Sequence, residues 1–323
     1  MKVDSCFSLD SNLGASASYT RQQALAWAKA ELVGASEPTD SPRLDAELLL
    51  CHVLSVTNAS LYTWPEKLLL PNQWLSFTQL VSERCIGKPV AHLLGKQGFW
   101  SLDLQVDAST LIPRPETELL VETVLELNLP AQASVVDLGT GSGAIALALA
   151  SEHPQWHVEG VDQSVDAVSL AKLNARKCNL ERVNFYQGDW AQGLVKDASR
   201  PLHCIVSNPP YIDAEDPHLS QGDVRYEPLS ALVADDYGMA DIDIIAKQAA
   251  QLLAVGGWLA FEHGYDQGVK VAKLLVSLGF NLVTTRKDYN GQDRVTVGQW
   301  LELESGSGLD NGLENSRRTK YER

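Results

Sequence analysis

One short segment places residues suited to hold a planar amine directly after a buried strand. The strand-like residues Ile205 and Val206 are apolar, and Ser207 and then Asn208-Pro209-Pro210-Tyr211 follow them. The two prolines fix the backbone and lack N–H groups, so the corner is stiff and its carbonyl oxygens are free. We predict that the Asn208 side-chain oxygen and the Pro209 carbonyl each accept one N–H bond from a planar NH2 group, on which Tyr211 stacks.

Such an NH2 group is a poor nucleophile, because its lone pair is conjugated with a carbonyl group or an aromatic ring. Two aimed acceptors favour its pyramidalisation as charge develops, which is a preorganised electrostatic effect. A sulfonium methyl group held in line is then displaced, so much of the catalysis is positioning. No strong general base is required before attack. The alternative interpretation is a proline-rich turn, since Asn-Pro commonly opens one.

A second motif is a glycine-rich loop between a predicted strand and a predicted helix. It reads Gly139-Thr140-Gly141-Ser142-Gly143. Glycines let the chain turn sharply and let a ligand approach the backbone, and a helix N-terminus adds oriented amides. Asp162 follows the next strand about twenty residues later, where an acidic side chain can accept both hydroxyls of a ribose. The pattern predicts a nucleoside cofactor.

The loop alone leaves that cofactor open, because Gly139, Gly141 and Ala144 also fit the dinucleotide pattern G-x-G-x-x-A. The absence of a second catalytic domain after the sheet favours the methyl donor S-adenosylmethionine over NAD. Asp189 and Trp190 follow the third strand. We expect Asp189 to accept the exocyclic amine of an adenine and Trp190 to cover the ring. An N-capping aspartate and a tryptophan at the core edge are the alternative.

The elements that position these motifs alternate regularly from Ser134 onward. This alternation predicts an α/β fold with a doubly wound, mostly parallel sheet, and a last strand pair without an intervening helix predicts an antiparallel finish. The expected strands are 135–137, 158–161, 183–186, 203–206, 258–261, 281–285 and 294–299, and the expected helices are 144–151, 165–179, 242–253 and 267–278.

Helical patterns precede this domain, with expected helix starts at Thr20, Ser41-Pro42 and Pro71. Another helix is expected from Pro115 to about Leu127. The organisation predicted is a disordered arm (1–18), a small helical domain (19–87), a hairpin linker (88–112) with a strand pattern at 99–106, a catalytic domain (113–301) and a disordered polar tail (302–323).

Bulk composition narrows the function classes. The formal net charge is -15, which argues against broad nucleic-acid binding, since that needs a basic surface. The five cysteines are scattered and form no C-x-x-C pair, so we expect neither a disulfide framework nor a metal site. No signal-peptide pattern is found, and no apolar run approaches the ~18 residues of a membrane helix. We therefore expect a cytoplasmic protein.

With these residues placed, the chain resembles the release factor glutamine methyltransferases of the HemK/PrmC type. The resemblance runs from about residue 41 to residue 300, and Leu111–Glu118 together with a preceding helical domain is its most specific part. The remaining segments that carry it are Gly87–Gly95, Phe99–Leu102, Asp137–Gly143, Asn208–Tyr211, Tyr226–Leu229, Phe261–Gly264 and Asp293–Val295.

The resemblance implies a Rossmann-like class I methyltransferase with a seven-stranded sheet, preceded by a helical domain that helps to dock the protein substrate. It implies N5-methylation of the glutamine in the Gly-Gly-Gln loop of peptide chain release factors, a step that serves translation termination. It assigns the methyl donor to Gly139–Gly143, Asp162, Trp190 and Asn208. It assigns the glutamine to Asn208, Pro209, Pro210 and Tyr211.

Rival interpretations remain at this point. An N6-adenine methyltransferase acting on DNA or RNA would offer the same NH2 group to the same corner, after base extrusion. A non-catalytic binding module and an NAD-dependent oxidoreductase are more distant. Arg114 and Glu116 fit a pocket gate, a substrate contact, a structural ion pair or a helix start, and His263 is interpreted as a structural histidine. The preferred release factor and the oligomeric state are not determined.

Overall fold

The computed structural model describes residues 18–301, so the expected arm, except for Ser18, and the expected tail lie outside the described residues. Within that range a seven-stranded sheet has the order β5-β4-β3-β6-β7-β9-β8. Its strands are β3 (Ser134–Leu138), β4 (His157–Asp162), β5 (Asn184–Gln187), β6 (Leu202–Ser207), β7 (Leu253–Glu262), β8 (Phe280–Lys287) and β9 (Asp293–Trp300). Pairing is parallel from β5 to β7, and β9 is antiparallel to both β7 and β8. The doubly wound sheet and its antiparallel finish are confirmed.

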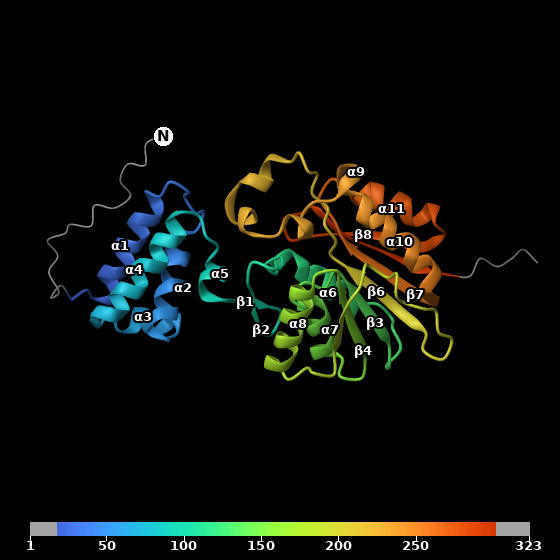
Figure 1. Cartoon of the computed structure of the whole chain (residues 1–323), viewed down its shortest axis with the longest axis horizontal. Coiled ribbons are helices and arrows are strands. Elements are labelled where there is room, and N and C mark those ends of the chain that lie inside the picture. The colour runs from blue at the N-terminus through green and yellow to red at the C-terminus, as the bar shows by residue number, and fades with distance from the viewer. Residues whose placement is uncertain (1–17, 302–323) are drawn as a thin grey trace, which may run out of the picture.

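Helices cover both faces of this sheet (Figure 1). One face carries α6 (Glu118–Leu125), α7 (Ala144–Glu152) and α8 (Val165–Lys177), and the other carries α10 (Ala240–Leu252) and α11 (Gly268–Ser277). Every residue of α7 from Ala144 to Ala150 is buried, as expected for a helix that is apolar all round. The 3₁₀ turn η1 (Pro115–Thr117) precedes α6, so the helix predicted from Pro115 is divided in two.

The N-terminal helices form a separate bundle at one end of the molecule (Figure 1). They are α1 (Arg21–Val33), α2 (Pro42–Leu54), α3 (Asn58–Thr63), α4 (Pro71–Cys85) and α5 (Val90–Leu94). Thr20 caps α1 in a capping box, and proline occupies the first position of α2 and α4. Sequence patterns predicted these three helices and missed the short α3 and α5, the latter inside the expected linker.

The hairpin that joins the two domains pairs β1 (Lys96–Phe99) with β2 (Leu102–Gln105). The expected strand pattern at 99–106 therefore covers only the tip and the second strand, because the turn falls at Trp100, whose φ is 56°. A long segment after β6 was not assigned to any element from sequence. It holds η2 (Pro217–Ser220), η3 (Gly222–Tyr226), η4 (Leu229–Ala231) and α9 (Asp235–Gly238).

The described residues 18–301 contain no helix with the length and apolar character needed to cross a bilayer. The same range contains no group of three or more His, Cys, Asp or Glu side chains placed to hold a metal ion.

Candidate functional site

The two sequence motifs meet at the point where the strand order reverses. The glycine loop follows β3 and the Asn-Pro-Pro-Tyr corner follows β6, which is its parallel neighbour in the sheet. The Ser207 hydroxyl donates to the Leu138 carbonyl at 2.7 Å and ties the two strand ends together. Ligands in open α/β sheets bind at such a switch point. A cavity of about 270 Å³ lies here, close to the lower end of the range for small-molecule sites.

The glycine loop forms one wall of this cavity. Gly139, Gly141 and Gly143 have φ angles of 71°, 53° and 85°, in the left-handed region where only glycine is unstrained. A Cβ atom at Gly143 would lie 3.1 Å from the Phe185 ring, so glycine there also lets α7 approach β5. The Thr140 hydroxyl donates to Asp137 at 2.6 Å and braces the turn.

Asp162 lies at the end of β4 and faces the same cavity. Its two carboxylate oxygens accept hydrogen bonds from the Gly141 amide at 2.8 Å and the Ser164 amide at 2.9 Å. Burial raises the pKa of Asp162, and these two bonds lower it in part. Each carboxylate oxygen keeps a further lone pair for a ligand. The contact with a ribose that the sequence predicts for Asp162 stays a prediction.

Asp189 and Trp190 line the cavity beyond the end of β5. Asp189 accepts a hydrogen bond from the Gln192 side chain at 2.7 Å. Trp190 has a φ of 48°, and its ring lies so close to Gly139 that a Cβ atom there would be 3.0 Å from it. Burial raises the pKa of Asp241, and a hydrogen bond with the Trp190 side chain lowers it in part.

Only two of the four residues in the corner after β6 line the cavity. Asn208 and Pro210 line the cavity, whereas Pro209 and Tyr211 are not among its lining residues. The Asn208 Nδ2 group donates to the Thr117 hydroxyl at 3.2 Å. The Tyr211 hydroxyl donates to Glu262 at 3.2 Å, and burial together with the Glu262 charge raises the pKa of Tyr211.

Sequence reasoning missed two other parts of the cavity wall. One is the stretch before α6, and the other is the long segment after the corner. The missed lining residues in these parts are Ser109, Thr110, Leu111, Pro113, Thr117, Pro228, Ser230 and Ala231. Part of their signal was present, because Leu111, Pro113, Thr117 and Pro228 lie in segments that carry the family resemblance, but no pattern assigned these four residues to a ligand.

Arg114 joins these two missed parts. Its guanidinium group binds both carboxylate oxygens of Glu227 at 2.8 Å, and the Ile112 amide donates to the same carboxylate at 3.1 Å. The Glu227 side chain is fully buried, which raises its pKa, while Arg114 lowers it. Of the roles open from sequence, the structure supports an ion pair that shapes the cavity wall.

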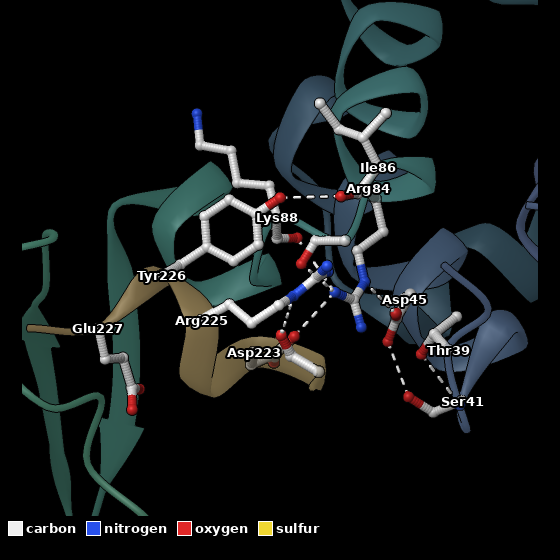
Figure 2. Close-up of polar contacts among 12 residues, drawn as sticks. Thr39, Ser41, Asp45, Arg84, Ile86, Lys88, Asp223, Arg225, Tyr226 and Glu227 are labelled. Carbon is white, nitrogen blue, oxygen red and sulfur yellow. Dashed lines mark hydrogen bonds and ion pairs between the residues drawn. The ribbon is translucent and has the colours of Figure 1, made fainter. Parts of the chain in front are cut away.

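We call residues 217–231 the strap, because they connect the cavity wall to the helical domain. Figure 2 shows its contacts with that domain. Arg84 from α4 donates to Asp223 at 2.9 Å and to the buried Asp45 at 2.7 Å. The Tyr226 hydroxyl donates to the Ile86 carbonyl at 2.8 Å. The strap therefore contacts the helical domain through Asp223 and Tyr226 in its middle, and the cavity through residues from Pro228 to its end.

His263 belongs to the packing beneath the site. Its two ring nitrogens lie 2.9 Å from the Gly264 carbonyl and 2.8 Å from the Thr296 hydroxyl. Burial lowers the pKa of His263, so the neutral form is favoured. Both nitrogens have partners inside the fold, which agrees with the interpretation as a structural histidine.

The charge of the cavity limits the ligand class. Its lining includes the carboxylates Asp162 and Asp189 and, within the described residues, no lysine, arginine or histidine. Such a wall suits a nucleoside that is neutral or carries a positive charge, and it offers no cation to the phosphates of a dinucleotide. The arrangement can hold a nucleoside and present an amide acceptor, Asn208, beside it.

Comparisons with known proteins match each of the two domains to a family. Residues 23–95 match the family described as the PrmC N-terminal domain, and residues 114–222 match the methyltransferase small domain. A release factor glutamine methyltransferase of Shewanella oneidensis is 50% identical over 281 residues, which cover 87% of this chain and 96% of that protein. The enzyme of the same name from Vibrio cholerae is 51% identical over 81% of this chain and 91% of its own length. That of Escherichia coli is 46% identical over 84% of this chain and 97% of its own length.

Proposed function

The chain belongs to the family of release factor glutamine methyltransferases, and from this premise we propose its substrate and its donor. It is a methyltransferase. The donor proposed is S-adenosylmethionine, and the acceptor is the N5 side-chain nitrogen of the glutamine in the Gly-Gly-Gln loop of peptide chain release factors. The observation that carries the proposal is the meeting of the glycine loop and Asn208 in one cavity.

The residues present fit the donor. Asp162 offers two carboxylate oxygens for the ribose hydroxyls, and Asp189 and Trp190 stand where the adenine would lie. Thr110 lines the cavity with a buried hydroxyl that has no hydrogen-bond partner among the described residues, so a polar ligand group would satisfy it. When bound, the donor supplies an electrophilic methyl group on a sulfonium sulfur, which leaves as a neutral thioether.

The protein's own contribution is to hold the glutamine amide. Asn208 Oδ1 and the Pro209 carbonyl are proposed to accept the two N–H bonds, and Pro210 and Tyr211 to confine the planar group. Because Pro209 and Tyr211 do not line the cavity, this amide is proposed to lie where the corner leaves the cavity wall. The nitrogen gains a methyl group, becomes acidic and releases one proton to solvent. Because the acceptors are fixed before the reaction, they stabilise the developing charge without reorganisation.

The partner is proposed to dock on the helical domain as well as at the cavity, and the protein is proposed to act in the cytoplasm during translation termination. Contact with nucleic acid is not part of the proposal, since the net charge is -15. The rival N6-adenine activity predicts instead a nucleic-acid substrate with salt-dependent binding.

The test is mass spectrometry of purified release factor after incubation with the protein and S-adenosylmethionine. We expect one added methyl group on the glutamine of the Gly-Gly-Gln loop. A release factor with glutamate at that position serves as the matched negative substrate, and adenine-containing single-stranded DNA tests the rival. Methylation of the DNA, or none of the release factor, would overturn the proposal.

A further inference from the structure

In the cavity wall, Asn208 is held by Thr117, a neighbour with a hydroxyl proton of its own to donate. Asn208 Nδ2 donates to Thr117 Oγ1 at 3.2 Å, and Thr117 is 4% exposed. A hydroxyl group has one proton and accepts with its lone pairs. Since the Thr117 oxygen already accepts from Asn208, its hydroxyl proton remains available for donation to a second neighbour.

Glu262 is that group. It ends β7, is 1% exposed, and its carboxyl group interacts with the Thr117 side chain. Oε1 accepts from the Tyr211 hydroxyl at 3.2 Å, while Oε2 has no close partner among the described residues. Burial raises the pKa of Glu262, whereas hydrogen bonding to the Thr117 and Tyr211 side chains and the charge of Arg294 lower it by favouring the carboxylate. A carboxylate accepts on both oxygens, so in this form Glu262 can take the Thr117 hydroxyl proton.

We propose that Glu262 and Thr117 are positioning residues that fix the orientation of the Asn208 amide. The hydroxyl proton points to Glu262, so Thr117 offers a lone pair to Asn208 and accepts its NH2 group. The oxygen of Asn208 is thereby left for the cavity. This inference rests on the proposed function, because only an NH2 substrate requires an acceptor there.

The reverse orientation would be inactive. With its amide turned by half a rotation, Asn208 would present NH2 to the NH2 group of the substrate, and the acceptor would be lost. Glu262 also holds Tyr211, so a single carboxyl group braces both ends of the Asn-Pro-Pro-Tyr corner. A change at Thr117 should therefore act on turnover through Asn208. Because Thr117 also lines the cavity, its effect on donor binding is measured separately.

The main variant is Thr117→Val, which keeps the shape and removes the hydroxyl. Loss of one aimed hydrogen-bonding group at a reacting centre costs about 10²–10³ in kcat. Because Thr117 acts only through Asn208, which is still present, we expect a smaller fall of about 10- to 100-fold. The dissociation constant for S-adenosylhomocysteine should stay within about twofold. Thr117→Ser restores the hydroxyl and should bring kcat back to within about threefold. The kcat of Glu262→Gln should lie between those of Thr117→Val and Thr117→Ser, because a glutamine amide can offer a donor where the carboxylate offered an acceptor.

Thr123→Val is the matched control. Thr123 is also buried, lies on α6 and donates to the Leu119 carbonyl at 2.6 Å, away from the corner. Thr123→Val should lose about as much thermal stability as Thr117→Val and keep the kcat of the parent. The inference is overturned if Thr117→Val stays within about threefold of the parent, if Thr117→Ser is equally impaired, or if both threonine variants lose turnover alike.

A second measurement does not depend on turnover. The side-chain amide signal of Asn208 in a ¹⁵N spectrum is identified by its absence in Asn208→Ala. We expect its NH2 protons to exchange with water at least about tenfold faster in Thr117→Val than in the parent. Unchanged exchange overturns the inference. If the exchange changes as expected but the parent does not methylate release factor, the proposed function is wrong. The hydrogen bond from Asn208 to Thr117 is then still supported.

Discussion

Replacing Asp162 by alanine tests the donor site most directly. The carboxylate accepts from the Gly141 and Ser164 amides and faces the cavity, so its loss removes the acceptor proposed for two ribose hydroxyls. Hydrogen bonds to a charged group contribute about 1.5–3 kcal/mol each. Two of them, allowing for non-additivity, amount to about 3 kcal/mol. We therefore expect Kd for the donor to rise about 100-fold.

The assay combines calorimetry with ligand-linked unfolding. At a donor concentration of about 100 times the parent Kd, binding stabilises the parent by about 2.7 kcal/mol. The same concentration only equals the Kd of Asp162→Ala, so the stabilisation should shrink to about 0.4 kcal/mol. Asp162→Asn keeps one neutral acceptor and should give an intermediate Kd. The ligand-free variants are measured alongside, since Gly141 and Ser164 also lose their partner.

Asp166→Asn is the control for this series. Asp166 lies in the first turn of α8, four residues from Asp162, is exposed and does not line the cavity. It removes the same charge and should leave the donor Kd within about twofold. An unchanged donor Kd in Asp162→Ala would refute the role of Asp162 as the ribose acceptor. An equal rise of the donor Kd in Asp166→Asn would show that the loss of any negative charge nearby has the same effect.

Three further perturbations have expected outcomes. Asn208→Ala should lower single-turnover methylation by about 10²–10³ and leave donor affinity within about tenfold, as measured by rapid quench and calorimetry. Arg84→Ala strands the buried Asp45 and breaks the bond to Asp223, so denaturant titration should find a loss of about 3 kcal/mol, and KM for release factor should rise. Burial raises the pKa of Asp137 to about 7, above the ~3.8 of the unfolded chain, so its stabilising contribution is complete below about pH 4 and is lost as pH rises through 7. Between pH 5 and pH 8 the parent should therefore lose a few kcal/mol relative to Asp137→Asn, and parallel pH profiles would contradict this.

Local rules were enough for much of the fold. The Thr20 cap, the prolines at the first positions of α2 and α4, and the alternation from β3 to β9 are all short-range signals, and each predicted element is present. The shorter α3 and α5 escaped because five or six residues carry too little periodicity to identify a helix. The 3₁₀ turns of the strap escaped for the same reason.

The sequence by itself determined which residues could do chemistry: a glycine loop before a helix, an acid after the next strand, and an amide fixed by two prolines. Chain geometry near each motif is local, so residue type and spacing specify it. Only the tertiary structure decided what surrounds them. Arg114 and Glu227 are 113 residues apart in the chain, and Thr117 and Asn208 are 91 apart. Such pairs form because the folded sheet brings distant connecting segments together at one edge, and no spacing rule encodes that contact.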